Sequence, residues 1–168
     1  MRSGDRRREP TASPIERNRV DAAPSTAAIL GHPIHPMLVP FPLAFLVGGL
    51  LTDLAYWGTA DAFWARASLW LVGAGVVAGA VASIAGLIDF FTIQRAREHA
   101  MGWVHFLGNA TALALSFLSW LFRVDDPASA VLPWGLVLSL VVAGILAVTG
   151  WAGGELSYRH RIGVMRGR

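Results

Sequence analysis

The sequence predicts an all-α membrane protein in which four transmembrane helices form an antiparallel bundle. Hydrophobic residues make up 54% of the 168 residues and the mean hydropathy is +0.50, although residues 1–28 are polar. Beyond them lie four apolar runs of about 19 to 25 residues, each long enough to cross a hydrocarbon core of about 30 Å. Tryptophans occur near the ends of these runs. Membrane interfaces favour tryptophan, so its placement supports the same boundaries.

Residues 1–28 are expected to form a disordered, arginine-rich tail. They are rich in Arg, Asp, Glu, Pro, Ser and Ala and show no apolar period. A secretory signal peptide is not expected, because no apolar core of 7–15 residues follows the basic start. Residues 29–168 then form a single four-helix transmembrane domain.

Prolines mark the start of the first span, expected at about 39–57. Proline is tolerated in the first helical turn, where N–H groups lack partners, and is costly further in. Pro40 and Pro42 therefore predict a helix start near Pro40, with His32–Pro36 as an extended or turn-like lead-in. The remaining spans are expected at about 67–91, 102–122 and 131–151.

Arginine placement predicts the orientation of the bundle. The tail, the loop between the second and third spans and the C-terminal segment carry most arginines, whereas Arg66 and Arg123 lie on the other side beside aspartates. Because positive residues favour the cytoplasmic side, both termini are expected in the cytoplasm. The GxxxG pair Gly75 and Gly79 favours close packing within the chain and leaves a homo-oligomer open.

Composition excludes several kinds of chemistry. The absence of cysteine excludes disulfides, cysteine-ligated iron–sulfur clusters, thioether-attached haem and thiol catalysis. The absence of lysine excludes a Schiff base. The net charge of +3 fits arginine contacts with anionic lipid headgroups, so nucleic acid is not an expected partner. No nucleotide-binding fingerprint or hydrolase nucleophile appears, and enzymatic activity on a soluble substrate is not expected.

The segment GHPIHPMLVPFP, residues 31–42, is the strongest candidate for chemistry. Imidazole binds metals and haem iron or carries a proton near neutral pH, and proline stiffens the backbone that holds it. His105 begins the third span among apolar neighbours, where an imidazole without a partner is unfavourable. The candidate cofactor-binding residues are His32, His35 and His105. His99 and His160 are expected to be solvated, with His160 as an outlying further ligand.

Three polar residues are expected to support this site. Asp89 closes the second span, Asn109 lies one turn after His105 on the same helix face, and Glu155 follows the fourth span. Because a helix C-terminus repels an anion, Asp89 is expected to pair with an arginine or histidine. Asn109 and Asp89 would orient an imidazole.

Asp53 is a separate candidate near the outer end of the first span. A carboxylate at this depth is expected to face the headgroups or to pair with Arg66. A role in a proton pathway is the alternative, because ionisable groups within a membrane are costly and often functional.

These motifs resemble the bacterial membrane protein family catalogued as domain of unknown function 2231. The resemblance covers most of the chain from Gly31 onward and rests on GHPIHPMLVPFPLAF, TDLAYW, GLIDF, RAREHAMGWVHFLGNA and GGELSYRHRIGV. It implies a multi-pass protein of the bacterial inner membrane without an assigned reaction. Association of family members with Rieske or cytochrome modules, and a layout similar to small di-haem cytochrome b proteins, imply redox work and redox partner proteins by analogy.

The histidines depart from a two-haem pattern. Two bis-histidine haems need four histidines divided between the two membrane faces, and the predicted outer face has none. One b-type haem or one metal ion is therefore the most that this chain could hold. Its expected ligands are His35 and His105, with His32 as the alternative first ligand.

Three functional hypotheses follow from the sequence. The first is a redox-associated bundle that binds a haem or metal ion on its cytoplasmic side. The second is a non-enzymatic structural bundle in which His32 or His35 holds Asp89 or Glu155 as a hydrogen-bonded latch. The third, least favoured, is a small transporter subunit or proton conduit that uses Asp53, because four spans are few and no inverted repeat is evident.

Overall fold

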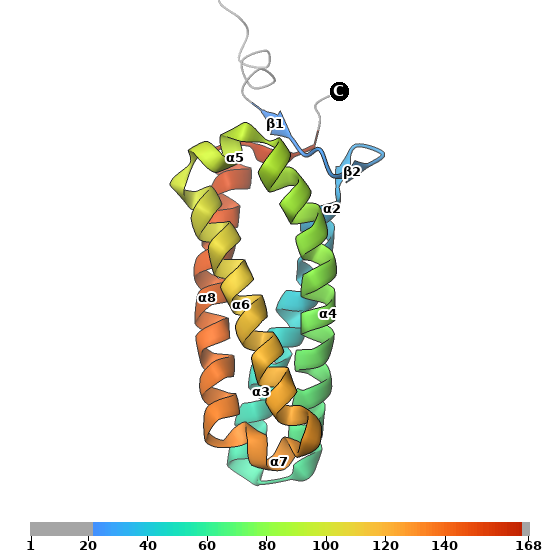
Figure 1. The fold of residues 1–168 in the computed structure, drawn as a ribbon, viewed down its shortest axis with the longest axis vertical. Helices are drawn as coiled ribbons and strands as arrows, with labels where there is room; N and C mark the ends of the chain where they lie inside the picture. The colour runs from blue at the N-terminus through green and yellow to red at the C-terminus, as the bar shows by residue number, and fades with distance from the viewer. Residues whose placement is uncertain (1–21, 166–168) are drawn as a thin grey trace, which may run out of the picture.

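Four long antiparallel helices form the body of the protein (Figure 1). The computed structural model describes residues 22–165. Its helical segments are α2 (Ile34–Leu38), α3 (Pro40–Thr59), α4 (Ala62–Thr92), α5 (Gln94–Glu98), α6 (Ala100–Asp125), α7 (Pro127–Ala130) and α8 (Leu136–Gly154), with wide π-type turns at Val131–Gly135 and Glu155–Arg159. Among the described residues, four segments are long and apolar enough to span a membrane: 34–59, 62–92, 100–125 and 127–159. The predicted four-span, all-α fold class is confirmed, and each expected span lies inside one of these segments.

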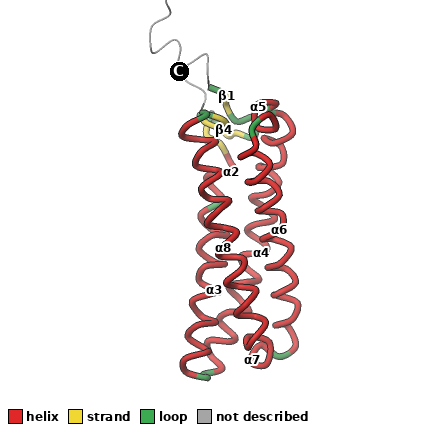
Figure 2. The backbone as a smooth tube through the Cα atoms, turned by 90° about the vertical axis from the view of Figure 1, so that its left-hand side faces the viewer, coloured by secondary structure: helices red, strands yellow, loops and turns green. Residues whose placement is uncertain are grey.

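Both ends of the described chain lie at one end of the bundle, here called the terminal end (Figures 1 and 2). Four short strands cover it: β1 (Ala23–Pro24), β2 (Ala28–Ile29), β3 (His32–Pro33) and β4 (Ile162–Val164). Strand β1 pairs in parallel with β4, and β2 forms an antiparallel hairpin with β3. Of the predicted tail, residues 1–21 lie outside the described part of the chain. Residues 22–28 belong to the fold, because β1 and β2 hold them by backbone hydrogen bonds.

The first span begins earlier than predicted. Its helix starts at Ile34, so His35 and Pro36 are helical and only His32 and Pro33 of the predicted lead-in are extended. Pro36 is the third helical residue, where the missing N–H would have no partner inside the helix. Val39, between α2 and α3, keeps helical backbone angles and donates to the His35 carbonyl oxygen at 3.1 Å, so α2 and α3 form one continuous span although Pro40 lacks an N–H donor.

Each long helix packs against two neighbours in the cyclic order α3, α4, α6, α8, which places α3 and α6 on a diagonal. Side chains on α6 that face inward recur at alternating intervals of four and three residues, the spacing of a left-handed bundle. They are His105, Asn109, Ala112, Ser116, Ser119 and Arg123. An apolar layer crosses the middle of the bundle at Leu46, Val72, Ala112 and Val142.

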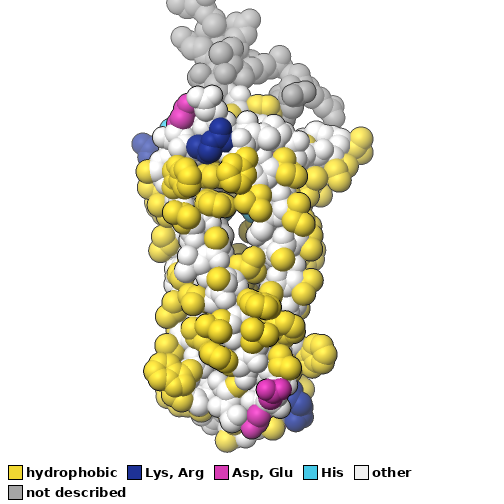
Figure 3. Space-filling view, viewed as in Figure 1, with side chains coloured by type: hydrophobic (Ala, Val, Ile, Leu, Met, Phe, Trp, Pro, Cys, Tyr) yellow, Lys and Arg dark blue, Asp and Glu magenta, His cyan; other side chains and the backbone are white. Residues whose placement is uncertain are grey.

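The outer surface of the bundle is largely hydrophobic, as a bilayer requires (Figure 3). Small residues inside allow the helices to approach closely. Gly75 of α4 faces the Leu46 side chain of α3, and Gly79 faces Leu113 of α6. The predicted GxxxG motif therefore packs within the chain.

Gly102, at the start of α6, is expected to tolerate no side chain. A Cβ there would lie 1.8 Å from the Ala96 carbonyl oxygen of α5. Gly102→Ala should lower the free energy of unfolding by at least about 2 kcal/mol, measured by thermal melting in detergent. Gly150→Ala in α8 is the matched control, because no atom lies within 4 Å of its Cβ position. Equal melting temperatures for the two variants would contradict the packing described for the α5–α6 turn.

Candidate functional site

His35 and His105 meet inside the terminal half of the bundle. They come from α2 and α6, which enter the bundle on diagonal sides. The ring centroids are 5.9 Å apart and the ring planes are nearly perpendicular, at 87°. Both side chains are partly buried. The structure thus brings together two of the three histidines expected to bind a cofactor.

Each of these rings is fixed by one hydrogen bond to a neighbouring helix. His35 Nδ1 lies 2.9 Å from the Ala82 carbonyl oxygen of α4, and His105 Nδ1 lies 2.9 Å from the Thr149 carbonyl oxygen of α8. A carbonyl oxygen only accepts, so Nδ1 carries the hydrogen and donates it. In the neutral ring Nε2 then keeps its lone pair. Histidines that bind metals commonly donate the other ring N–H to a backbone carbonyl in this way.

A glycine lies against each ring. It follows the accepting carbonyl by four residues in both cases, as Gly86 in α4 and Gly153 in α8. A Cβ at either position would lie 2.9 Å from ring atoms of His35 or His105. Since real Cβ atoms do not approach so closely, glycine is needed for the rings to lie where they do. The two imidazoles therefore occupy matched sites on α4 and α8.

Apolar layers lie on both sides of the histidine pair along the bundle axis. Toward the terminal end, Phe106 stacks on Phe90 with ring centroids 4.5 Å apart. This stack joins a buried cluster of Phe90, Ile93, Ala96, Leu156 and Ile162. In the other direction lies the middle layer around Ala112. Figure 3 shows the surface hollowed between α4 and α6 in the upper part of the molecule.

Asn109 ties α6 to α8 beside the histidine pair. Its Nδ2 donates to the His105 carbonyl oxygen at 2.7 Å, and its Oδ1 accepts from Thr149 Oγ1 at 3.2 Å. The amide therefore fixes the backbone that carries the His105 ring and the residue whose carbonyl binds that ring. This differs from the expected direct contact with an imidazole.

Asp89 holds the lead-in segment onto the end of α4. Its carboxylate accepts hydrogen bonds from Ser25 Oγ at 2.7 Å, Thr26 N at 2.8 Å, Thr26 Oγ1 at 3.0 Å and Ala27 N at 2.9 Å. The expected arginine or histidine partner is replaced by these neutral donors. Among residues 22–165, backbone N–H groups and hydroxyls stabilise the carboxylate. We call this contact the Asp89 strap.

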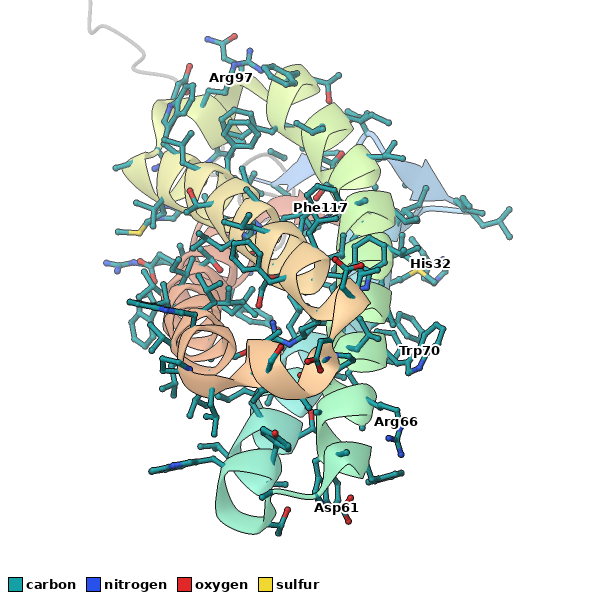
Figure 4. The ribbon with its side chains drawn as sticks, turned by 60° about the horizontal axis from the view of Figure 1, so that its bottom comes forward. His32, Asp61, Arg66, Trp70, Arg97 and Phe117 are labelled. Atoms are coloured by element: carbon teal, nitrogen blue, oxygen red, sulfur yellow. The ribbon has the colours of Figure 1, made fainter. Side chains whose placement is uncertain are left out.

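The remaining candidates lie apart from the histidine pair. His32 is exposed on the outer side of the bundle, where its Nδ1 bonds the Leu30 carbonyl oxygen (Figure 4). Glu155 pairs with Arg159 at 2.7 Å, and its carboxylate is 4.0 Å from His160 Nε2. The His160 ring in turn contacts His99, with centroids 4.1 Å apart. Among the residues of the described range, neither Asp89 nor Glu155 bonds His32 or His35.

A second polar centre lies at the opposite end of the bundle. Asp53 is fully buried and pairs with Arg123, whose Nη2 is 2.7 Å from Asp53 Oδ2. Ser68 Oγ donates to Asp53 Oδ1 at 2.5 Å and Ser139 Oγ donates to Oδ2 at 2.6 Å. Arg123 also donates to Ser119. This group, called the ion-pair centre, joins all four long helices.

The expectation that Asp53 faces the headgroups or pairs with Arg66 is wrong. Arg66 is exposed on the outside of α4 (Figure 4). Asp53 points inward, where a carboxylate without a countercharge would be very costly. Arg123 supplies that charge from an inward position of α6.

From the sequence, Arg123 is identified only as an arginine beside a span end, and its buried role is missed. The spacing of histidines and charged residues could have indicated that role. Asp53 follows His35 by 18 residues, and Arg123 follows His105 by 18 residues. Eighteen residues are five helical turns, so each pair shares one helix face. The first and second helical hairpins therefore form an approximate repeat, with the histidines and the opposite charges at equivalent positions.

Removal of Arg123 is expected to destabilise the bundle strongly. Arg123→Met leaves Asp53 buried without a countercharge and should cost about 3–5 kcal/mol of unfolding free energy, measured by denaturation in detergent. The double variant Asp53→Leu, Arg123→Met should recover most of this loss, because no buried charge remains. Arg66→Met serves as the exposed control and should change stability by less than about 1 kcal/mol. A single Arg123→Met variant as stable as this control would refute the role of the ion-pair centre.

Comparison with protein families places this chain beside a family of membrane proteins. A family model described as predicted membrane protein (DUF2231) matches residues 31–166, a range that includes both the histidine pair and the ion-pair centre. No curated protein and no solved structure matches the chain. The match covers far more than half of the sequence, and the four membrane-length helices agree with its description. The protein therefore belongs to the DUF2231 family of predicted membrane proteins.

Proposed function

We propose that this protein is a membrane electron carrier in which His35 and His105 hold a single b-type haem inside the helical bundle. The observation that carries the proposal is the pair of Nδ1–H bonds to backbone carbonyls, which leaves Nε2 of each facing ring free. The two rings are held by equivalent hydrogen bonds, and their centroids lie 5.9 Å apart.

The donor set favours haem over a bare metal ion. Within residues 22–165, no group of three or more His, Cys, Asp or Glu side chains could hold a metal ion. Structural metal ions such as zinc usually need four ligands, whereas haem iron takes only two from the protein. Two imidazoles that bind one metal at about 2 Å have ring centres about 6 Å apart. The observed separation agrees with this value. A metal ion bound by two histidines remains the second reading of the same geometry.

The surrounding residues are suited to holding such a group. The carbonyls of Ala82 and Thr149 orient the rings, and Asn109 fixes the backbone of His105. The phenylalanine stack and the middle apolar layer supply apolar surroundings on both sides of the pair. Held by His35 and His105, such a group would supply one-electron transfer. The protein itself would then exchange electrons with redox partner proteins rather than catalyse a reaction.

The orientation proposed for the site is the cytoplasmic side of the bacterial inner membrane. The terminal end carries Arg95, Arg97, Arg159 and Arg161, whereas the other end carries Arg66 and the buried Arg123. By the positive-inside rule, both termini and the histidine pair face the cytoplasm.

Substitution of either histidine of the pair should abolish haem binding. We expect His35→Ala and His105→Ala each to remove the Soret band of protein purified in detergent, because each variant lacks one of the two side chains that would hold the haem. His32→Ala and His160→Ala are the matched controls and should retain the band. Each variant is first checked for a monodisperse helical fold by gel filtration and circular dichroism.

A rescue experiment separates ligation from folding. In His105→Gly the lost side chain leaves a small hole, and added imidazole should restore the Soret band. The proposal fails if wild-type protein, expressed with haem and metals supplied, shows neither visible absorbance nor a stoichiometric metal.

A structural bundle without a cofactor is the second candidate function. It is favoured by the fact that each histidine of the pair already binds a neighbouring helix, so that the rings could pin α2 to α4 and α6 to α8. In that case wild-type protein is colourless, and His35→Ala lowers only the yield of folded protein.

The ion-pair centre places Asp53 where the proton-conduit hypothesis would use it. Unchanged proton flux in proteoliposomes of Asp53→Asn protein would dismiss that reading.

A further inference from the structure

The hairpin of β2 and β3 forms an apolar groove on the outside of the bundle. The groove has a volume of about 380 Å³ and is lined by Ile29, Leu30, His32, Ile34, Met37 and Leu38. It lies between the hairpin and the first turns of the helix that continues into α3. His32 is its single ionisable side chain.

The hairpin turn is strained and exposes its leucine. The two central residues, Leu30 and Gly31, have φ angles of +51° and +80°. Turns of this kind favour Asn-Gly or Asp-Gly, since a branched or bulky residue is strained at positive φ. Yet the Leu30 side chain is 94% exposed and gains no packing from the protein. His32 holds the turn through a hydrogen bond from Nδ1 to the Leu30 carbonyl oxygen, 3.1 Å apart.

The position of the groove points to lipid. Ile34 is the first residue of a membrane-length apolar segment, so the groove lies where the span enters the bilayer. The hairpin projects sideways from the bundle rather than along its axis (Figure 1). Hydrophobic side chains gather at this corner of the molecule (Figure 3). Met37, at 61% exposure, extends the same apolar surface down the helix.

We infer that the groove binds one acyl chain of a phospholipid and that Leu30 inserts beside it into the edge of the bilayer. Lipid contact explains why a strained turn presents leucine, because burial of this side chain among acyl chains offsets the strain. The Asp89 strap fixes the segment that precedes the hairpin, so the hairpin begins at a defined place on α4. The inference does not depend on a haem at the histidine pair.

The depth of Leu30 can be measured directly, because the chain contains no cysteine. Leu30→Cys is labelled with a nitroxide in vesicles of phosphatidylethanolamine and phosphatidylglycerol. Collisions of the label with oxygen should exceed those with a water-soluble nickel complex, as they should for Val77→Cys on the lipid-facing side of α4. Glu98→Cys, exposed in α5, is the aqueous control. A label at residue 30 that behaves like the one at residue 98 overturns the inference.

Lipid retention tests the groove itself. Native mass spectrometry of protein stripped of lipid and then supplied with phosphatidylglycerol should show one tightly retained lipid. Met37→Asn places an amide against the acyl chain and should weaken retention by about tenfold. Leu51→Asn on α3, exposed but outside the groove, should retain the lipid. Equal retention by the two variants would show that the groove is not the binding site.

Discussion

The buried ion pair of Asp53 and Arg123 is the interaction on which the arrangement of the bundle depends. Between helices in lipid there is no hydrophobic driving force, so packing and polar contacts decide which faces meet. This pair joins α3 to α6 across the diagonal, and serines of α4 and α8 complete it. Breaking it leaves an uncompensated charge, which makes other registers of the four helices unfavourable. Because α3 and α6 are rigid, fixing them at one end also fixes the relative height of His35 and His105 at the other.

The Asp89 strap has a similar role at the terminal end. One carboxylate holds Ser25, Thr26 and Ala27, and the Ala27 carbonyl oxygen accepts a hydrogen bond from the Ile34 N–H at the start of α2. The strap therefore positions both the hairpin and the short helix that carries His35. The candidate cofactor site and the lipid groove lie on the inner and outer sides of the same few residues.

The number of spans and the fold class could be predicted because each depends on local properties: the length of an apolar run and the turns that interrupt it. The candidate histidines could be predicted because an imidazole beside prolines or within a membrane span is unusual. The hydrogen-bond and ion-pair partners of the two carboxylates were harder to predict. The partner of Asp53 depends on which faces of α3 and α6 meet, and the partner of Asp89 lies in a segment that reads as a polar tail. The start of the first helix was predicted too late, because Pro36 is compatible with both an extended lead-in and a first helical turn.

The approximate repeat of the two helical hairpins has a consequence for assembly. If two copies of the first hairpin paired with one another, Asp53 would face a second Asp53; two copies of the second would bring Arg123 against Arg123. Either encounter buries like charges, whereas the native combination buries opposite ones. The two hairpins therefore share a packing pattern, but each disfavours pairing with a copy of itself. The opposite charges of Asp53 and Arg123 favour pairing of the first hairpin with the second.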